Sequence, residues 1–446
     1  MQPEHRAQPG SQPGGWGSGQ QYGQSSGQPA GQPAARAASR PDGSSAGQGA
    51  AASAQQPPSV PPQVDPQTAG AGSVPTTSSR MTVPGYPSGP AAPAEEKVDT
   101  GPLPSRETLR REARAASSRR GAGDADVERA GELLKSVANI FSQRVVGQEQ
   151  LRRALVTALM SSGHILLESV PGLAKTTAAQ TLASAVSGSF RRIQCTPDLM
   201  PNDIVGTQIL NSSTGEMTTQ LGPVHANIVL LDEINRSSAK TQSAMLEAMQ
   251  ERQTSIGGVV YPLPHPFMVL ATQNPIEEEG TYVLPEAQMD RFLMKEVLTY
   301  PRPSEEADVL DRISNGSFDQ PVTGRPISTD DVEWLQRAAE RVYVDPVIKQ
   351  YIVALINTSR GGGPRPVPGL DRQVRVGASP RGGIALMKVA QAVALQEGRT
   401  YVIPDDVRLL RHGVLRHRLV LTYDALADGV APEAIIDAIF AAVPTP

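Results

Sequence analysis

The chain has 446 residues, a single cysteine and a formal net charge of −4. This length accommodates two or three domains, and the slightly acidic balance gives no electrostatic reason to expect nucleic acid or a membrane surface as a partner. One cysteine, Cys195, allows no internal disulfide, and no apolar run of membrane-spanning length or secretory signal is found, so we expect a cytoplasmic protein.

Residues 1–124 consist largely of Gln, Gly, Pro, Ala and Ser, as in "GSQPGGWGSGQQYGQSSGQPAGQP". This composition cannot bury enough apolar surface to offset the entropy lost on ordering, so we predict a disordered tail. Within it, residues 104–120, "PSRETLRREARAASSRR", combine helix formers with many arginines. Two interpretations of this segment stay open: a solvated nascent helix, or a short basic helix that docks on a partner.

Residues 125–300 have the pattern of an α/β domain. Apolar residues at helical spacing predict helices at 126–141, 149–160, 175–186 and 238–250. Short apolar runs predict five strands, at 165–168, 191–195, 228–232, 267–272 and 292–298. Strands that alternate with helices indicate a parallel sheet with both faces covered. Cys195, Met245 and Met249 are interpreted as residues of its core.

Residues 301–446 show almost wholly helical periodicity. The predicted helices are 305–313, 329–340, 345–357, 381–397, 404–415 and 432–440. A loop rich in Gly and Pro, "GGGPRPVPG" at 361–369, interrupts them. We therefore predict a separate helical domain.

The stretch "LLESVPGLAKTT", residues 166–177, has the apolar lead-in, the Pro-Gly turn and the Lys-Thr pair of a phosphate-binding loop. Ser169 and Ala174 stand where the usual pattern, G-x-x-x-x-G-K-[ST], has glycines. After the turn at Gly172, Lys175 would reach the β- and γ-phosphates and the Thr176 hydroxyl would bind Mg²⁺. By itself, the stretch also fits a strand, turn and helix with an ordinary surface lysine.

Two further strand ends carry polar side chains that suit this chemistry. "NIVLLDEIN" ends in Asp232, which suits Mg²⁺, and Glu233, which suits polarisation of an attacking water. "VLATQNP" places the Asn274 amide where it could meet the γ-phosphate or the water. An acidic strand end alone is common. Its occurrence downstream of the loop makes the two motifs together much stronger evidence for a nucleotide site than either motif alone.

Two arginines complete the set of candidates. Arg291, in "LPEAQMDRF", lies between a helical turn and a strand, so it could project from an edge. Arg381, in "GASPRGG", falls in the first turn of a predicted helix, where the helix dipole favours acids. This mismatch suggests that Arg381 faces an anion from outside its helix.

From about residue 126 to 446 the chain resembles the MoxR family of AAA+ ATPases. The resemblance rests on six blocks in order: "VVGQ", "VPGLAKT", "CTPDLMPNDIVG", "GPVHANIVLLDEINRSSAKTQSAMLEAMQER", "ATQNPIEEEGTYVLPEAQMDRF" and "GASPRGG". It implies an AAA+ P-loop core with a parallel sheet and a C-terminal all-helical lid. The family has Ala where this chain has Ala174, but Gly where it has Ser169.

The resemblance also implies roles for single residues. Val145, Val146 and Gly147 would flank the adenine. The residues implied to form Walker A, and so to hold ATP, are Ser169, Val170, Pro171, Gly172, Leu173, Ala174, Lys175, Thr176 and Thr177. The remaining roles are Mg²⁺ ligation by Thr176 and Asp232, and catalysis by Glu233 of Walker B, Asn274 as sensor 1, Arg291 as arginine finger and Arg381 as sensor 2, in cis or in trans.

Beyond these residues, Arg236 is a weaker candidate for a second trans-acting arginine. Residues 202–223 match the family's helix-2 insert, a β-element facing a central pore, and "RQTSIGGVVYPLPHP" matches a hairpin with Gly257 and Gly258 at its turn. The resemblance thus implies a Mg²⁺-dependent ATPase ring, a hexamer, that remodels protein clients with von Willebrand factor A domain partners.

Two alternatives stay open. An ATP-binding scaffold with weakened hydrolysis would be consistent with Ser169 in the loop. A nucleic-acid-remodelling machine of the same fold is disfavoured by the acidic balance and by the lack of basic residues interleaved with aromatic ones.

Overall fold

The computed structural model describes residues 121–170, 172–275 and 281–446. Most of the predicted tail lies outside these residues, and so does Pro171 of the loop. No helix among the residues described is both long enough and apolar enough to span a membrane.

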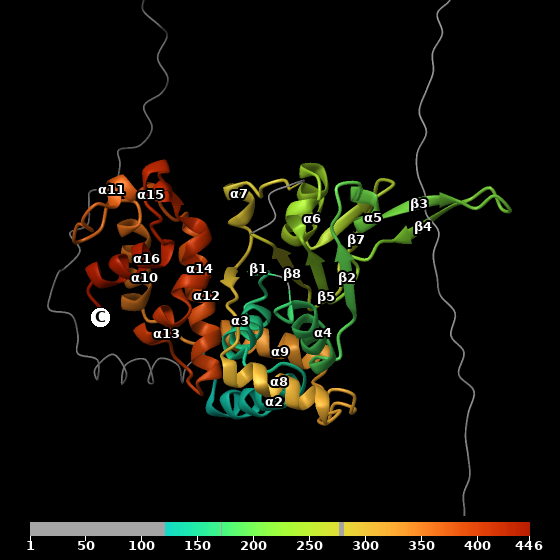
Figure 1. The fold of residues 1–446 in the computed structure, drawn as a ribbon, viewed down its shortest axis with the longest axis horizontal. Helices are drawn as coiled ribbons and strands as arrows, with labels where there is room; N and C mark the ends of the chain where they lie inside the picture. Colours follow the sequence, from blue (N-terminus) through green and yellow to red (C-terminus); the bar gives the residue numbers. More distant parts are fainter. Residues whose placement is uncertain (1–120, 171, 276–280) are drawn as a thin grey trace, which may run out of the picture. The chain divides into compact units, whose positions relative to one another are not determined.

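The five predicted strands form one parallel sheet (Figure 1). Its strands are β1 (Ile165–Glu168), β2 (Phe190–Gln194), β5 (Ile228–Asp232), β8 (Met268–Gln273) and β9 (Met294–Val297). Their order in the sheet is β2-β5-β8-β1-β9. The continuous apolar runs arise because the sheet is covered on both faces.

Two buried clusters lie on opposite faces of this sheet. Ile228 and Leu230 of β5 join one cluster, whereas Val229 and Leu231 join the other, as the alternation of a strand requires. The second cluster contains Cys195 and the methionines of α6 (Ala239–Glu251), which confirms these residues as core. The first contains side chains of α2 (Asp124–Arg144), α3 (Glu149–Met160) and α4 (Lys175–Ala185).

The C-terminal region is helical, as predicted. Its main helices are α8 (Pro303–Ser314), α9 (Thr329–Glu340), α10 (Pro346–Thr358), α12 (Pro380–Gln396), α13 (Pro404–Leu409), α14 (Arg411–Leu415) and α16 (Pro432–Ala442). Its shorter elements are α11 (Leu370–Gln373), α15 (Tyr423–Ala427) and the strands β10 (Val374–Val376) and β11 (Val420–Leu421). These helices share the first cluster with α2 and α3, so the apolar core is continuous across residue 300.

One predicted helix is two. The expected helix at 404–415 breaks at Leu410, whose φ of −112° and ψ of 24° are not helical. Leu410 is buried, and after the break α14 packs on β9, with Gly413 lying against the Glu296 side chain. The packing of Gly413 and α14 against β9 therefore overrides the continuous apolar periodicity that predicted a single helix.

Two hairpins extend the sheet domain. The segment predicted to be a helix-2 insert contains α5 (Pro201–Val205) and the antiparallel pair β3 (Gly206–Leu210) and β4 (Met217–Leu221), which we call the β3–β4 arm (Figure 1). The second hairpin pairs β6 (Gln253–Ile256) with β7 (Val259–Pro262). Gly257 and Gly258 form its turn with φ of +59° and +82°, as predicted for such a loop.

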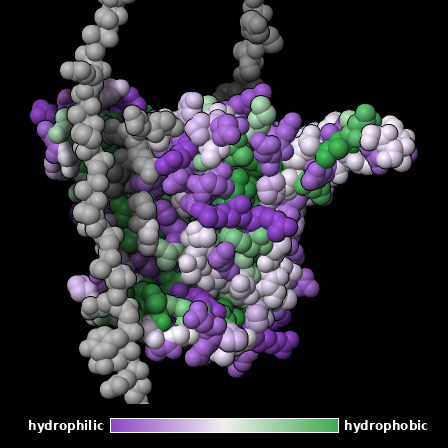
Figure 2. Space-filling model, turned by 45° about the vertical axis from the view of Figure 1, so that its right-hand side comes forward, coloured by the Kyte–Doolittle hydropathy of each residue, from purple (hydrophilic) through white to green (hydrophobic). Residues whose placement is uncertain are grey.

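Apolar side chains are exposed on both hairpins, and the green patches on the β3–β4 arm in Figure 2 show part of this surface. The exposed apolar residues are Ile209, Leu210, Met217, Leu221, Val259 and Val260. The hairpins touch one another through the Thr219 and Tyr261 hydroxyls, 3.0 Å apart.

Candidate functional site

The strand order brings three predicted site segments to one edge of the sheet. β1 leads into the phosphate loop (residues 169–177), β5 ends at Asp232, and β8 ends just before Asn274. These three strands are adjacent and parallel, so their carboxyl ends meet. Ligands of open parallel sheets bind at this edge.

The phosphate loop leaves room for an anion. Gly172 has a φ of +87°, and among the residues that the structure describes, its chain neighbours apart, no atom lies within 4 Å of the position that a Cβ would take. The N-cap of α4 is Ala174, whose side chain cannot accept a hydrogen bond, so the first backbone N–H groups of the helix can serve a phosphate. The Lys175 ammonium donates to the Ser169 carbonyl oxygen at 3.3 Å, within the loop itself.

The two departures from the glycine pattern differ in their structural consequence. Ser169 is 3% exposed; its N–H donates to the Gln273 carbonyl at 3.2 Å, and its hydroxyl donates to the Val170 carbonyl at 3.0 Å. It is not among the residues with positive φ, whereas Ala174 has a φ of +54°. The left-handed region costs a residue other than Gly about 1 kcal/mol, so the conformational demand lies at Ala174.

A pocket of about 750 Å³ opens beside the loop, a size that suits a small-molecule ligand. We call it the loop pocket. Val145 and Val146, predicted to flank adenine, line it, and Gly147 follows directly in the chain. The other lining residues that matter here are Gly172, Leu173, Ala174, Thr177, Tyr300 and Leu310.

The acidic strand end is held by neighbouring side chains. Asp232 is 8% exposed; its Oδ1 accepts from the Thr272 hydroxyl at 2.8 Å, and its Oδ2 accepts from Arg192 Nη2 at 2.5 Å. Glu233 has a φ of +58°, and its Oε2 accepts from Gln194 Nε2 at 3.0 Å. Thr272, Arg192 and Gln194 belong to none of the candidate site residues predicted from the sequence, because they reach this strand end from neighbouring strands of the sheet.

The residues present fit a magnesium ion of the kind that accompanies a nucleotide. Within the ranges described, no group of three His, Cys, Asp or Glu side chains could hold a metal by itself. Magnesium instead commonly binds one or two carboxylates together with phosphate oxygens and water. The Asp232 carboxylate and the Thr176 hydroxyl supply hard oxygen donors of this type.

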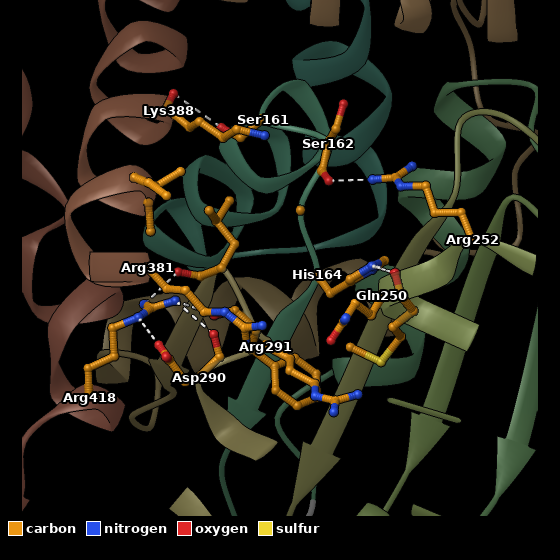
Figure 3. Close-up of a pocket in the computed structure, with 16 residues that line it drawn as sticks. Ser161, Ser162, His164, Gln250, Arg252, Asp290, Arg291, Arg381, Lys388 and Arg418 are labelled. Carbon is orange, nitrogen blue, oxygen red and sulfur yellow. Dashed lines mark hydrogen bonds and ion pairs between the residues drawn. The ribbon is translucent and has the colours of Figure 1, made fainter. Parts of the chain in front are cut away.

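Arg291 and Arg381 lie together, but they do not line the loop pocket. Both line a second pocket of about 310 Å³, which we call the arginine pocket (Figure 3). Arg252, Lys388 and His164 also line this pocket. In the part of the chain that the structure describes, Arg291 and Arg381 have no ion-pair partner, so their charge is available to an anion from outside.

A clamp around Asp290 sets the spacing of these arginines. The Asp290 carboxylate accepts from Arg418 Nε and from the Ser379 hydroxyl, both at 2.7 Å. The Arg418 side chain is 2% exposed; its burial lowers its pKa, and Asp290 counteracts this effect. Ser379 also caps α12, accepting from the Arg381 N–H at 3.1 Å. The clamp therefore joins the segment of Arg291 to the helix of Arg381.

His164 adds no charge to the arginine pocket at neutral pH. Burial lowers its pKa to about 4, because the charged ring would be desolvated. Its Nδ1 lies 3.0 Å from the Val269 N–H and accepts from it, so Nε2 carries the proton and donates to the Met249 carbonyl at 3.1 Å. The cations of this pocket are therefore arginines and a lysine.

Comparison with known proteins agrees with this architecture. The family described as "ATPase family associated with various cellular activities (AAA)" matches residues 164–294, and an AAA lid domain matches residues 370–439. Chaperone MoxR1 of Mycobacterium tuberculosis is 48% identical over 302 residues, covering 68% of this chain and 79% of the relative. Protein MoxR of Methylorubrum extorquens is 31% identical over 328 residues, covering 69% and 93%.

A solved structure is also similar. It is described as a putative ATPase from Cytophaga hutchinsonii and aligns with a TM-score of 0.68 at 40% identity. The alignment covers 75% of this chain and 99% of that one.

Proposed function

Because the chain belongs to the MoxR family of AAA+ ATPases, we propose that it hydrolyses ATP with Mg²⁺ as a homo-oligomeric ring, a hexamer, and remodels protein clients. The observation that supports the ring is the separation of the loop pocket from the arginine pocket. Arg291 and Arg381 line a different pocket from the loop of the same subunit, so the nucleotide site would be completed by the arginines of a neighbouring subunit.

Within one subunit, the proposed roles follow the strand ends. The N-terminus of α4 and Lys175 hold the phosphates, and Asp232 and Thr176 hold Mg²⁺, which would neutralise phosphate charge when bound. Glu233 orients the attacking water, and Asn274, buried after β8, contacts the water or the γ-phosphate.

Across the subunit interface, Arg291 acts as the arginine finger. Charge that develops on the transferred phosphoryl group is stabilised by a guanidinium placed in advance. Because the Asp290 clamp fixes Arg381 beside Arg291, we assign both to the neighbour's nucleotide, that is, sensor 2 in trans. Hydrolysis then depends on assembly.

The proposed clients are proteins, with von Willebrand factor A domain proteins as partners by family resemblance. The exposed apolar side chains of the β3–β4 arm and of the β6–β7 hairpin support a protein-contacting role, because apolar patches of this kind mark interaction surfaces. Both hairpins would face the central pore.

The test is ATP turnover per subunit as a function of protein concentration, with light scattering as the measure of assembly. We expect turnover per subunit to rise as the oligomer forms. Equal turnover in monomer and oligomer would contradict the shared site.

The alternative, a scaffold that binds ATP but hydrolyses little, rests on Ser169, which stands where the family has Gly. Tight ATP binding with no turnover in the assembled protein would favour it. Ser169 itself is buried, has no positive φ and donates its hydroxyl to the Val170 carbonyl, and none of these features points to a weakened loop.

A further inference from the structure

Arg192 donates hydrogen bonds to one of the two oxygens of the Asp232 carboxylate, which we propose as a ligand of Mg²⁺. Its Nη2 and Nε donate to Asp232 Oδ2 at 2.5 and 3.0 Å. The other oxygen, Oδ1, accepts from Thr272. The Arg192 side chain is 48% exposed, so it can swing into solvent without opening the core.

The same guanidinium reaches the second acid through one intermediate. Arg192 Nη2 also donates to Gln194 Oε1 at 2.8 Å, and Gln194 Nε2 donates to Glu233 Oε2 at 3.0 Å. Arg192 and Gln194 are two residues apart on β2, so their side chains lie on the same face of the strand. Arg192 thus fixes which end of the Gln194 amide faces Glu233.

These contacts place the Arg192 guanidinium on the carboxylate to which the proposed function assigns Mg²⁺. The Arg192 guanidinium, 2.5 Å from Oδ2, would compete with a divalent ion for that oxygen, because like charges at this distance repel one another in a partly buried site. We propose that Arg192 is a tethered counter-ion that neutralises Asp232 in the metal-free subunit and must leave when the metal arrives. This inference rests on the proposed function.

The hydrogen bonds through Gln194 extend the consequence to Glu233. When Arg192 leaves Asp232, Gln194 loses the donor that orients its amide, and its hold on Glu233 weakens. Arg236, whose Nε lies 3.0 Å from Glu233 Oε2, then remains as the neighbour of that carboxylate. Arg192 is thereby a positioning residue: metal arrival at one acid loosens the other, the one that orients water.

The experiment measures metal affinity rather than turnover. Mn²⁺ replaces Mg²⁺ as the probe, and the loss of its free electron paramagnetic resonance signal reports binding to the protein–ADP complex. We expect Arg192→Gln to bind Mn²⁺ about fivefold more tightly than the natural protein, as expected when an ion pair with one exposed partner no longer competes. Arg192→Lys, which keeps the charge, should stay close to the natural affinity.

Arg191→Gln is the matched control, since it removes the same charge from the next residue of β2, which points to the other face. Its Mn²⁺ affinity should not change. An equal gain in both Gln variants would show a general charge effect and overturn the proposal. Weaker metal-free ADP binding by Arg192→Gln would make Arg192 a phosphate ligand and overturn it as well.

A double-mutant cycle tests the link through Gln194. Gln194→Met removes the acceptor that helps to hold Arg192, so we expect it to tighten Mn²⁺ binding less than Arg192→Gln does. The double variant should match Arg192→Gln alone, because the two changes act through one contact. Additive effects would disprove the link. If the natural protein binds ADP but takes up no Mn²⁺ with it, the proposed function fails, and the inference fails with it.

Discussion

The acidic strand end and the arginine pocket carry opposite charges, and they differ in how those charges are held. Asp232 and Glu233 are each in contact with an arginine of the same chain, Arg192 and Arg236 respectively. Arg291 and Arg381 have no such acid among the residues that the structure describes. Within one subunit, Asp232 and Glu233 are therefore paired with arginines, whereas Arg291 and Arg381 are available to an anion from another molecule.

This difference indicates which interactions form inside a subunit and which wait for assembly. Contacts already present can be changed by a ligand that competes for them, as we propose for Arg192. Contacts that are still absent can be made only by a second molecule. Variants in the two regions should therefore affect different steps.

The largest expected effect comes from the arginine pocket. Arg291→Ala should reduce turnover by about 10³-fold, the low end for arginine fingers, because charge on the γ-phosphate loses its partner. Nucleotide affinity measured by equilibrium binding should not change. Mixing this variant with Lys175→Ala subunits should restore part of the activity, since each supplies what the other lacks. No recovery at any mixing ratio would exclude action in trans.

The next effect comes from the acidic strand end. Glu233→Gln should reduce turnover by about 10²-fold or more, because the amide cannot polarise the attacking water. ATP binding and assembly should persist, and steady-state hydrolysis together with size-exclusion chromatography measures both. Near-normal turnover would reject the role of Glu233.

A smaller effect on turnover is expected when one hydrogen bond of the Asp290 clamp is removed. Ser379→Ala removes the helix cap and the hydrogen bond to Asp290, which should lower the free energy of unfolding by about 1 kcal/mol. Turnover should fall severalfold at unchanged nucleotide affinity, because Arg381 and Arg291 lose their fixed spacing. Ser328→Ala, which removes a similar cap from α9, is the control. If it lowers turnover equally, the effect is one of stability alone.

The smallest effects are expected within the loop. Ser169→Gly and Ala174→Gly should each change ATP affinity less than about tenfold, or roughly 1.4 kcal/mol. Their effects on stability should have opposite signs. Ala174→Gly removes the cost of a left-handed backbone at a residue with a Cβ and should raise the free energy of unfolding by about 0.5 kcal/mol. Ser169→Gly increases the conformational entropy of the unfolded chain and should lower the free energy of unfolding. Denaturant unfolding measures both, and a much tighter ATP complex for either glycine variant would favour the scaffold alternative.

Much of the fold could be predicted because its signals are local. The apolar runs at 165–168 and 228–232 coincide with β1 and β5, and the glycine pair correctly marks the turn of the β6–β7 hairpin. The loop and the acidic strand end were found from their spacing along the chain. Their roles as binding and catalytic groups stay predictions.

The remaining features depend on which segments become neighbours. Arg192 and Asp232 are 40 residues apart, and Asp290 and Arg418 are 128 apart, so no local pattern relates them. The left-handed conformation of Ala174 follows from the turn into α4, not from the residue type. The break at Leu410 arises from packing on β9, which overrides the helical period.

The apolar cluster that runs across residue 300 also determines how the molecule melts. α12 contacts both α2 and α3, and α9 packs on α3, so the helices under the sheet are covered by chain from the C-terminal region. A protein truncated after residue 300 would lose α9 and α12 from the surface of α3 and would expose part of the apolar cluster to water. We therefore expect the two regions to unfold in one cooperative transition, and we expect a ligand bound at the loop to raise the melting temperature of both together.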